Sequence, residues 1–157
     1  MNIEIEMMNG DIIKAELYPD VAPITVENFV KLINENFFDG LIFHRVIRGF
    51  MIQGGGYDAN GNHKDADSIK GEFTANGVTN NLKHTRGVLS MARTMFPNSA
   101  SSQFFIMHED APHLDGQYAG FGKVTEGIEA VDKIAECKTD MGDAPIEPQV
   151  IKTIRLA

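Results

Sequence analysis

One segment, FHRVIRGFMIQGGG at residues 43–56, combines cationic, amide and large apolar side chains beside three consecutive glycines. Arg45 carries a planar guanidinium that stays charged near neutral pH, and Gln53 carries an amide. Phe50 and Met51 add apolar surface. Such a site can hold an apolar group and donate fixed hydrogen bonds to it without attacking it covalently.

A second segment, around Gln103 and Phe105, also offers a glutamine and a large apolar side chain. Because side chains alternate along a strand, Met51 and Gln53 lie on one face of their strand, and Gln103 and Phe105 lie on one face of theirs. The two strands can therefore offer both pairs to the same surface. An isolated Met or Phe is usually an ordinary core residue. Glutamines are poor core residues unless they are paired, so a shared functional surface is the stronger interpretation.

The cationic and glycine residues of the first segment leave alternatives open. Arg45 can be the functional cation, or an arginine at the rim that reaches solvent or pairs with a carboxylate. Arg48 precedes Gly49 in a polar turn and is interpreted as solvated. No Lys-Ser or Lys-Thr follows the triple glycine at 54–56, which therefore indicates close backbone packing and not a phosphate site.

Covalent and metal chemistry find little support in the sequence. Cys137 ends an amphipathic helical pattern with no histidine nearby, and Ser90 lacks the glycine-flanked turn of a hydrolase. No histidine forms the helical pair with glutamate that is typical of zinc enzymes. We expect no cofactor and no metal, and hydrogen-bonded structural roles for the histidines His44, His63, His84, His108 and His113.

Short strands with polar turns must position these residues. Alternation around Ile3 and Ile13 predicts an opening hairpin with a primed turn at Asn9-Gly10. Apolar spacing predicts a helix capped by Thr25, and another near 128–136. Further strands are predicted at Leu41–Ile47, Phe50–Gln53, Val88–Ala92, Gln103–Met107, Tyr118–Val124 and Val150–Leu156, with an irregular surface region at Asp58–Asn81. This pattern favours a mainly antiparallel β-barrel.

Composition limits the partners and the compartment. The chain has 157 residues and a formal charge of −8, without a basic stripe, which argues against nucleic-acid binding. It contains a single cysteine, no secretory pattern at its start and no apolar run of the roughly 20 residues that a membrane span requires. We expect one domain over residues 1–157, cytoplasmic and monomeric.

The same motifs closely resemble the cyclophilins, the family of peptidyl-prolyl cis/trans isomerases. The resemblance rests on residues 43–56, on KHTRGVLSMA at 83–92, on SSQFFI at 101–106 and on LDGQYAGFGKV at 114–124. It implies a closed eight-stranded antiparallel barrel capped by two helices, with a peptide groove outside the barrel. It implies that Arg45 is catalytic and that the substrate is bound by Phe50, Met51, Gln53, Ala92, Arg93, Gln103, Phe105, His113, Leu114 and Tyr118.

The sequence departs from the best-known family members at the groove. His113 stands where many carry tryptophan, Tyr118 where they carry histidine, and Arg93 where they often carry asparagine; the loop 94–101 looks one residue longer. Losing the flat indole surface predicts weak binding of cyclosporin A. The expected partners are proline-containing peptides and folding protein clients.

Two functions remain open from the sequence. The first is an isomerase that accelerates rotation about X–Pro bonds through a hydrogen bond from Arg45 to the imide nitrogen. The alternative is a module that binds proline segments, or a chaperone, with incidental isomerase activity. Retention of the arginine with the apolar pocket favours the enzyme, because binding alone would not require that cation.

Overall fold

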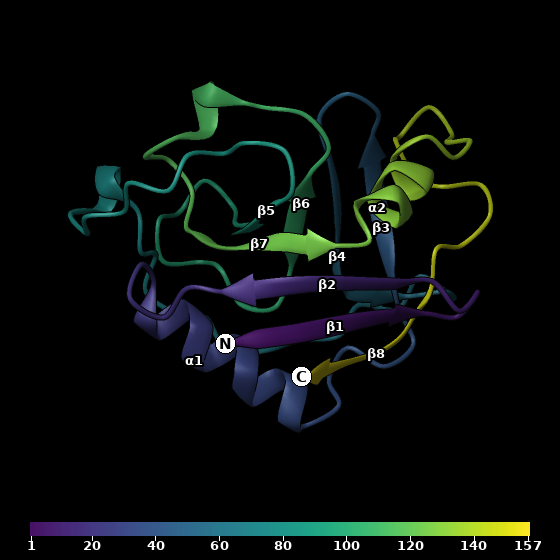
Figure 1. The fold of residues 1–157 in the computed structure, drawn as a ribbon, viewed down its shortest axis with the longest axis horizontal. Helices are drawn as coiled ribbons and strands as arrows, with labels where there is room; N and C mark the ends of the chain where they lie inside the picture. The colour runs from purple at the N-terminus through teal and green to yellow at the C-terminus, as the bar shows by residue number, and fades with distance from the viewer.

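Eight antiparallel strands form the body of the computed structural model, which describes residues 1–157 (Figure 1). In spatial order the sheet runs β3-β4-β6-β5-β7-β2-β1-β8. Its two edges meet where Ile42 bridges Val150 and the Phe43 N–H donates to the Gln149 carbonyl at 3.0 Å. The predicted barrel is thus confirmed, as a nearly closed one. The strands are β1 Asn2–Met7, β2 Ile12–Leu17, β3 Leu41–Ile47, β4 Met51–Asp58, β5 Val88–Met91, β6 Phe104–Met107, β7 Gly120–Glu126 and β8 Ile151–Leu156.

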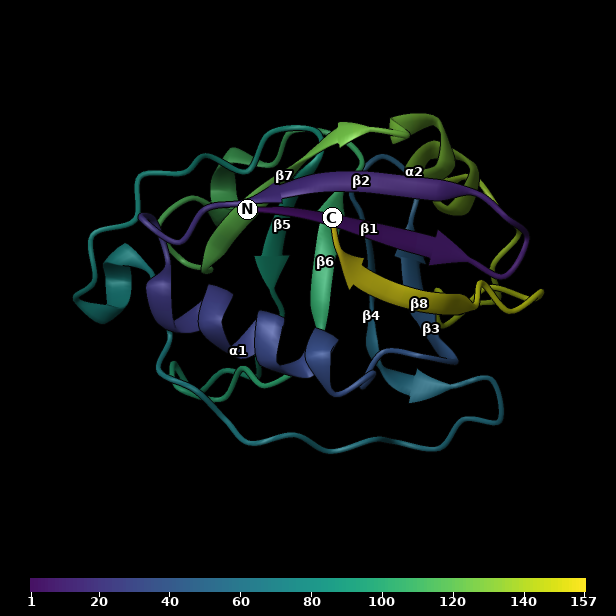
Figure 2. The same ribbon diagram turned by 60° about the horizontal axis from the view of Figure 1, so that its bottom comes forward.

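Both predicted helices are present, α1 at Pro23–Asn34 and α2 at Ile128–Ala135. They lie on different sides of the barrel, and α1 runs past the ends of β5 and β6 (Figure 2). Its fully buried Phe29 lies 5.3 Å from the Phe104 ring and 5.1 Å from the Phe121 ring. This aromatic cluster fills the barrel interior, so the outer face of the sheet is left for a site.

The predicted cap of α1 is wrong. Thr25 lies inside the first turn, whereas the helix begins at Pro23, whose fixed φ suits a first helical position. The N–H and hydroxyl of Thr25 donate instead to the Glu72 carboxylate at 2.6 and 2.8 Å. A carboxylate from a distant loop therefore satisfies a free N–H at the helix start.

The turn of the opening hairpin also differs from the prediction. A primed turn at Asn9-Gly10 would require positive φ at its first central residue, Asn9, but only Gly10 has it, at φ 96°. The Asn9 side chain instead accepts a hydrogen bond from the Asp11 N–H at 2.9 Å. The connection is a longer loop in which a single glycine takes the left-handed conformation.

Strand β4 and the region that follows it differ from the prediction. Strand β4 continues through the triple glycine to Asp58, because glycine allows β3 and β4 to approach closely: a Cβ at Gly54 would lie 2.6 Å from the Ile42 carbonyl oxygen. The region 58–81 does contain little regular structure, but Glu72 and Phe73 in it are buried. It is therefore not simply a surface loop, since it covers the start of α1.

Candidate active site

Strand register places three candidate residues in one row. Arg45 on β3 lies opposite Gln53 on β4, and Gln53 lies opposite Phe105 on β6. The neighbouring Ile52 is fully buried in the barrel core. Because side chains alternate between the faces of a sheet, Gln53 and Phe105 lie on the outer face. The faces predicted from the alternation are thus brought together on adjacent strands.

A second, smaller apolar cluster lies outside the main core. It contains Met51, Phe105 and Leu114, with Phe50 and Tyr118 packed against it. Met51 and Phe105 are only 2% and 5% exposed, so both are well packed. Their cluster is separate from the barrel interior and forms the apolar part of a surface cleft.

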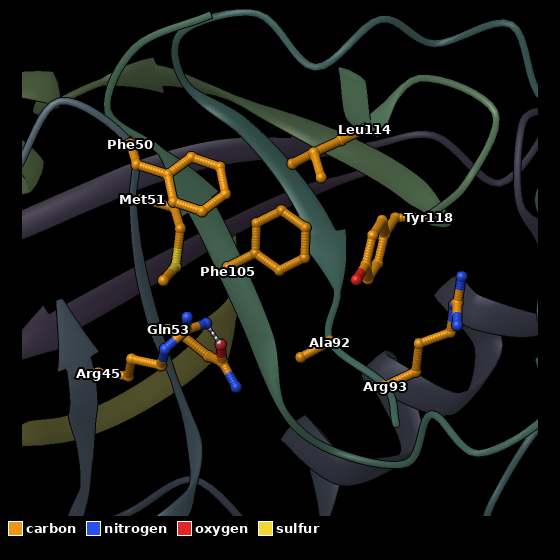
Figure 3. Close-up of a pocket in the computed structure, with 9 residues that line it drawn as sticks. All are labelled: Arg45, Phe50, Met51, Gln53, Ala92, Arg93, Phe105, Leu114 and Tyr118. Atoms are coloured by element: carbon orange, nitrogen blue, oxygen red, sulfur yellow. Dashed lines mark hydrogen bonds between the residues drawn. The ribbon is translucent and has the colours of Figure 1, made fainter. Parts of the chain in front are cut away.

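Figure 3 shows this cleft, which has a volume of about 270 Å³. The Phe105 ring lies in the middle of the view, with Arg45 on one side and Arg93 on the other. Nine of the predicted site residues line the cleft: Arg45, Phe50, Met51, Gln53, Ala92, Arg93, Phe105, Leu114 and Tyr118.

The two remaining predicted residues lie just outside the cleft. Gln103 lines a neighbouring cavity of about 270 Å³ and accepts a hydrogen bond from the Gln53 amide at 3.0 Å. His113 is exposed on the short helical turn Pro112–Leu114, with its ring centroid 5.8 Å from that of Phe50. Gln103 thus orients a cleft residue, and His113 lies at the rim.

A chain of hydrogen bonds links the polar residues of the cleft. The Arg45 guanidinium donates to the side-chain oxygen Oε1 of Gln53 at 3.4 Å, and the side-chain Nε2 of Gln53 donates to Oε1 of Gln103. Arg45 is exposed and forms no ion pair with a carboxylate, unlike Arg48, which lies 3.5 Å from Glu136. The Arg45 guanidinium therefore keeps hydrogen-bond donors for a ligand.

The triple glycine at 54–56 allows close packing around these hydrogen-bonded side chains, as the sequence indicated. A Cβ on Gly56 would lie 2.5 Å from the Gln103 side chain, so a larger residue there would displace it. Gly55 has φ 91°, which favours glycine. These glycines allow close packing next to the site.

Arg93 is held by aromatic rings at the other side of the cleft. Its guanidinium carbon lies 4.6 Å from the ring centroids of both Phe73 and Tyr118. It also donates to the carbonyl oxygens of Thr94 at 2.9 Å and Gln117 at 2.6 Å. Stacking and hydrogen bonds together fix this cation in one place.

Sequence reasoning missed a buried polar network behind Phe105. The His84 ring hydrogen-bonds to the Ser90 hydroxyl at 2.8 Å and to the Asp115 carboxylate at 3.1 Å, and it stacks on the Phe105 ring at 6.1 Å. Ser90 is fully buried and faces no cleft, so it is not an available nucleophile. No local pattern could have indicated this network, because Asp115 lies 31 residues from His84.

Burial lowers the pKa of His84, although hydrogen bonding to Asp115 acts in the opposite direction. Burial likewise lowers the pKa of His44. The unfolded chain therefore binds protons more readily than the folded chain just below pH 6.5. We expect the free energy of unfolding to fall as the pH is lowered through that region, by up to about 1.4 kcal/mol per pH unit for each such histidine.

Urea denaturation at several pH values between 5 and 8 measures this dependence. His84→Gln should weaken it, because a neutral amide has no proton to gain. A slope below pH 6.5 that is identical in the variant and the parent would show that His84 does not contribute.

Two further observations concern the whole molecule. No group of three or more His, Cys, Asp and Glu side chains is arranged to hold a metal ion. Neither helix has the length and apolar character that crossing a membrane requires.

Comparisons with known proteins agree with this geometry. The family model "Cyclophilin type peptidyl-prolyl cis-trans isomerase/CLD" matches residues 1–156. A peptidyl-prolyl cis-trans isomerase of Schizosaccharomyces pombe is 42% identical over 157 residues, covering 99% of each chain. Peptidyl-prolyl cis-trans isomerase B of Bacillus subtilis is 50% identical over 121 residues, covering 77% of this chain and 81% of the relative.

A solved structure has the same fold. The cyclophilin of Cryptosporidium parvum, crystallised in the presence of the dipeptide Ala-Pro, superimposes with a TM-score of 0.85 at 32% identity, covering 100% of this chain and 99% of that one. The family match over nearly the whole chain and the shared barrel lead to one conclusion. This chain belongs to the cyclophilin-type peptidyl-prolyl cis-trans isomerase family.

Proposed function

We propose that the cleft accelerates rotation about X–Pro bonds and that Arg45 is its catalytic residue. The observation that carries this proposal is the row of Arg45, Gln53 and Phe105 across three strands, in a cleft whose other walls are largely apolar. A cleft of about 270 Å³ with apolar side chains on most of its walls suits a proline ring, and a guanidinium without a carboxylate partner beside it suits a nitrogen whose lone pair becomes localised on rotation.

The chemistry follows from the electronic structure of the imide. The X–Pro bond resists rotation because its nitrogen lone pair is shared with the carbonyl, and uncatalysed exchange takes ~10–100 s. Twisting the bond localises that lone pair on nitrogen. Arg45 then donates a hydrogen bond that is strong only in the twisted state, which is preferential binding of the transition state.

Positioning provides the remaining acceleration. Met51, Phe105 and Leu114 hold the ring, while Gln53, oriented by Gln103, binds a neighbouring backbone carbonyl. One side of the bond can then turn while the other stays fixed. Shortening ~100 s to about a millisecond requires ~7 kcal/mol, of which one preorganised donor provides about 3–4 kcal/mol.

The expected substrates are proline-containing peptides and unfolded or folding proteins. The related Cryptosporidium parvum structure, obtained in the presence of Ala-Pro, supports a proline ligand for this chain as well. We further propose that residues 1–157 act as one monomeric domain in the cytoplasm, with no nucleic-acid or membrane partner. The acidic balance of 22 Asp and Glu against 14 Lys and Arg supports the first of these exclusions.

A protease-coupled assay with a proline peptide tests the proposed activity. At nanomolar protein, an isomerase shortens the slow phase of peptide cleavage in proportion to its concentration. A module that only binds would need stoichiometric protein to change that phase, and would slow cleavage by sequestering the peptide. The second result would replace the enzyme with the binding module.

Cyclosporin A is expected to bind weakly, with a dissociation constant in the micromolar range or above. His113 is exposed at the rim and offers less flat apolar surface than an indole. Inhibition of turnover by cyclosporin measures the affinity, and His113→Trp should strengthen it. Tight binding by the parent, well below micromolar, would contradict this prediction.

A further inference from the structure

The charge of the groove is opposite to that of the molecule. The chain carries −8, yet the cleft and the neighbouring cavity are lined by no Asp or Glu side chain. The charged or titratable side chains that line them are Arg45, Arg93, His63 and Tyr118, of which only the two arginines carry a permanent charge. Asp65 contacts His63 at 2.8 Å but does not line either space.

The arginines of this chain divide into two groups. Arg48, Arg86 and Arg155 pair with carboxylates at 3.5, 2.7 and 2.7 Å. Arg45 and Arg93 pair with none, and both line the cleft. The proposed mechanism uses Arg45 at the imide nitrogen, whereas the Arg93 cation contacts aromatic rings and backbone carbonyl oxygens and has no anionic partner.

Arg93 lies where the cleft and the neighbouring cavity meet. It lines both spaces, which also share Gln53 and Ala92, so a peptide that has its proline in the cleft and extends into the neighbouring cavity passes Arg93. Apart from Arg93 and His63, the polar side chains that line that cavity are uncharged and include Thr94, Ser99 and Gln103. Phe73 and Tyr118 hold the guanidinium in place, which reduces the entropy lost when an anion binds.

We propose that Arg93 selects substrates with an Asp or Glu side chain within two residues of the proline, on the side of the neighbouring cavity. This inference rests on the proposed isomerase function and adds a charge preference to it. Arg93 acts as a specificity residue, because its contact is with a flanking side chain and not with the rotating bond. An exposed pair of this kind corresponds to about three- to fivefold in kcat/KM.

Exchange NMR on blocked proline peptides tests the preference without a coupling protease. Four positions, two before and two after the proline, are occupied in turn by Glu or by Gln. We expect a Glu-to-Gln ratio of kcat/KM of about three to five on one side of the proline. The ratio should fall toward one in 1 M salt, because screening weakens an exposed pair.

Substitutions of Arg93 separate charge from structure. The ratio should fall to about one in Arg93→Gln and below one in Arg93→Glu, while Arg93→Lys should keep part of it. Lys138→Gln, an exposed change outside both spaces, alters the net charge equally and should leave the ratio unchanged. A structural role alone would slow all peptides together without moving the ratio.

The same measurements distinguish failure of the charge preference from failure of the proposed isomerase function. If the parent accelerates the Gln peptides but its Glu-to-Gln ratio is near one on both sides of the proline, the charge preference is wrong and the isomerase stands. A ratio above one that persists in Arg93→Gln would also overturn the role of Arg93. If no peptide is accelerated, the isomerase function itself fails.

Discussion

Replacing Arg45 by alanine lowers kcat/KM for a proline peptide by about 100- to 1,000-fold, and the fold survives. The loss is large because the guanidinium is the one cleft donor assigned to the imide nitrogen during rotation. The fold survives because Arg45 is exposed, with a single long hydrogen bond, to Gln53 at 3.4 Å. The protease-coupled assay measures the rate, and circular dichroism with thermal unfolding measures the fold.

Two variants sharpen the Arg45 experiment. Arg45→Lys should recover little activity, because an ammonium lacks the planar fork that can contact Gln53 and the imide together. Arg48→Ala is the matched control: Arg48 lies on the same hairpin but outside the cleft, and its loss should change kcat/KM less than twofold. Turnover by Arg45→Ala equal to that of the parent would remove this residue from the mechanism.

Replacing Glu72 by alanine lowers the free energy of unfolding by about 2–4 kcal/mol. The Glu72 side chain is 2% exposed and accepts from both the N–H and the hydroxyl of Thr25. Alanine leaves two donors at the start of α1 without their partner, and buried unpaired donors are costly. Urea denaturation, analysed with a common m-value, measures the change.

Two control variants show whether the loss in Glu72→Ala comes from its hydrogen bonds to Thr25 or from removing any carboxylate near α1. Glu72→Gln keeps an acceptor oxygen and should lose less than Glu72→Ala. Glu27→Ala removes an exposed carboxylate from α1, the helix that Glu72 supports, and should change the free energy of unfolding by less than about 0.5 kcal/mol. If Glu72→Ala and Glu27→Ala lose similar amounts, the long-range cap contributes little to stability.

The order of the elements was predictable from local patterns. Alternation around Ile3 and Ile13 indicated the hairpin, and three-and-four spacing around Phe29 indicated α1. Both depend on side chains within a few residues of one another, which is the range over which sequence periodicity acts. Strand β4 was predicted too short, because a run of glycines resembles a break when its partner strands are unknown.

The residue types of the cleft were also predictable, with help from the resemblance. Arg45, Gln53 and Phe105 are unusual among apolar neighbours or recur within family motifs. What the sequence could not indicate was that the three residues form one row, because Arg45 and Phe105 are 60 positions apart in the sequence. The register of β3, β4 and β6 decides it, and register depends on packing of the whole sheet.

The sequence by itself determined the alternating strands, the two helices, the acidic balance and the motifs of the family. The tertiary structure alone decided that Glu72 supports α1, that His84 links Ser90 to Asp115 behind Phe105, and that two aromatic rings hold Arg93 beside the cleft. The physical reason is one of range. Periodicity and turn chemistry act between neighbours in the chain, whereas these contacts join segments that only the closure of the barrel brings together.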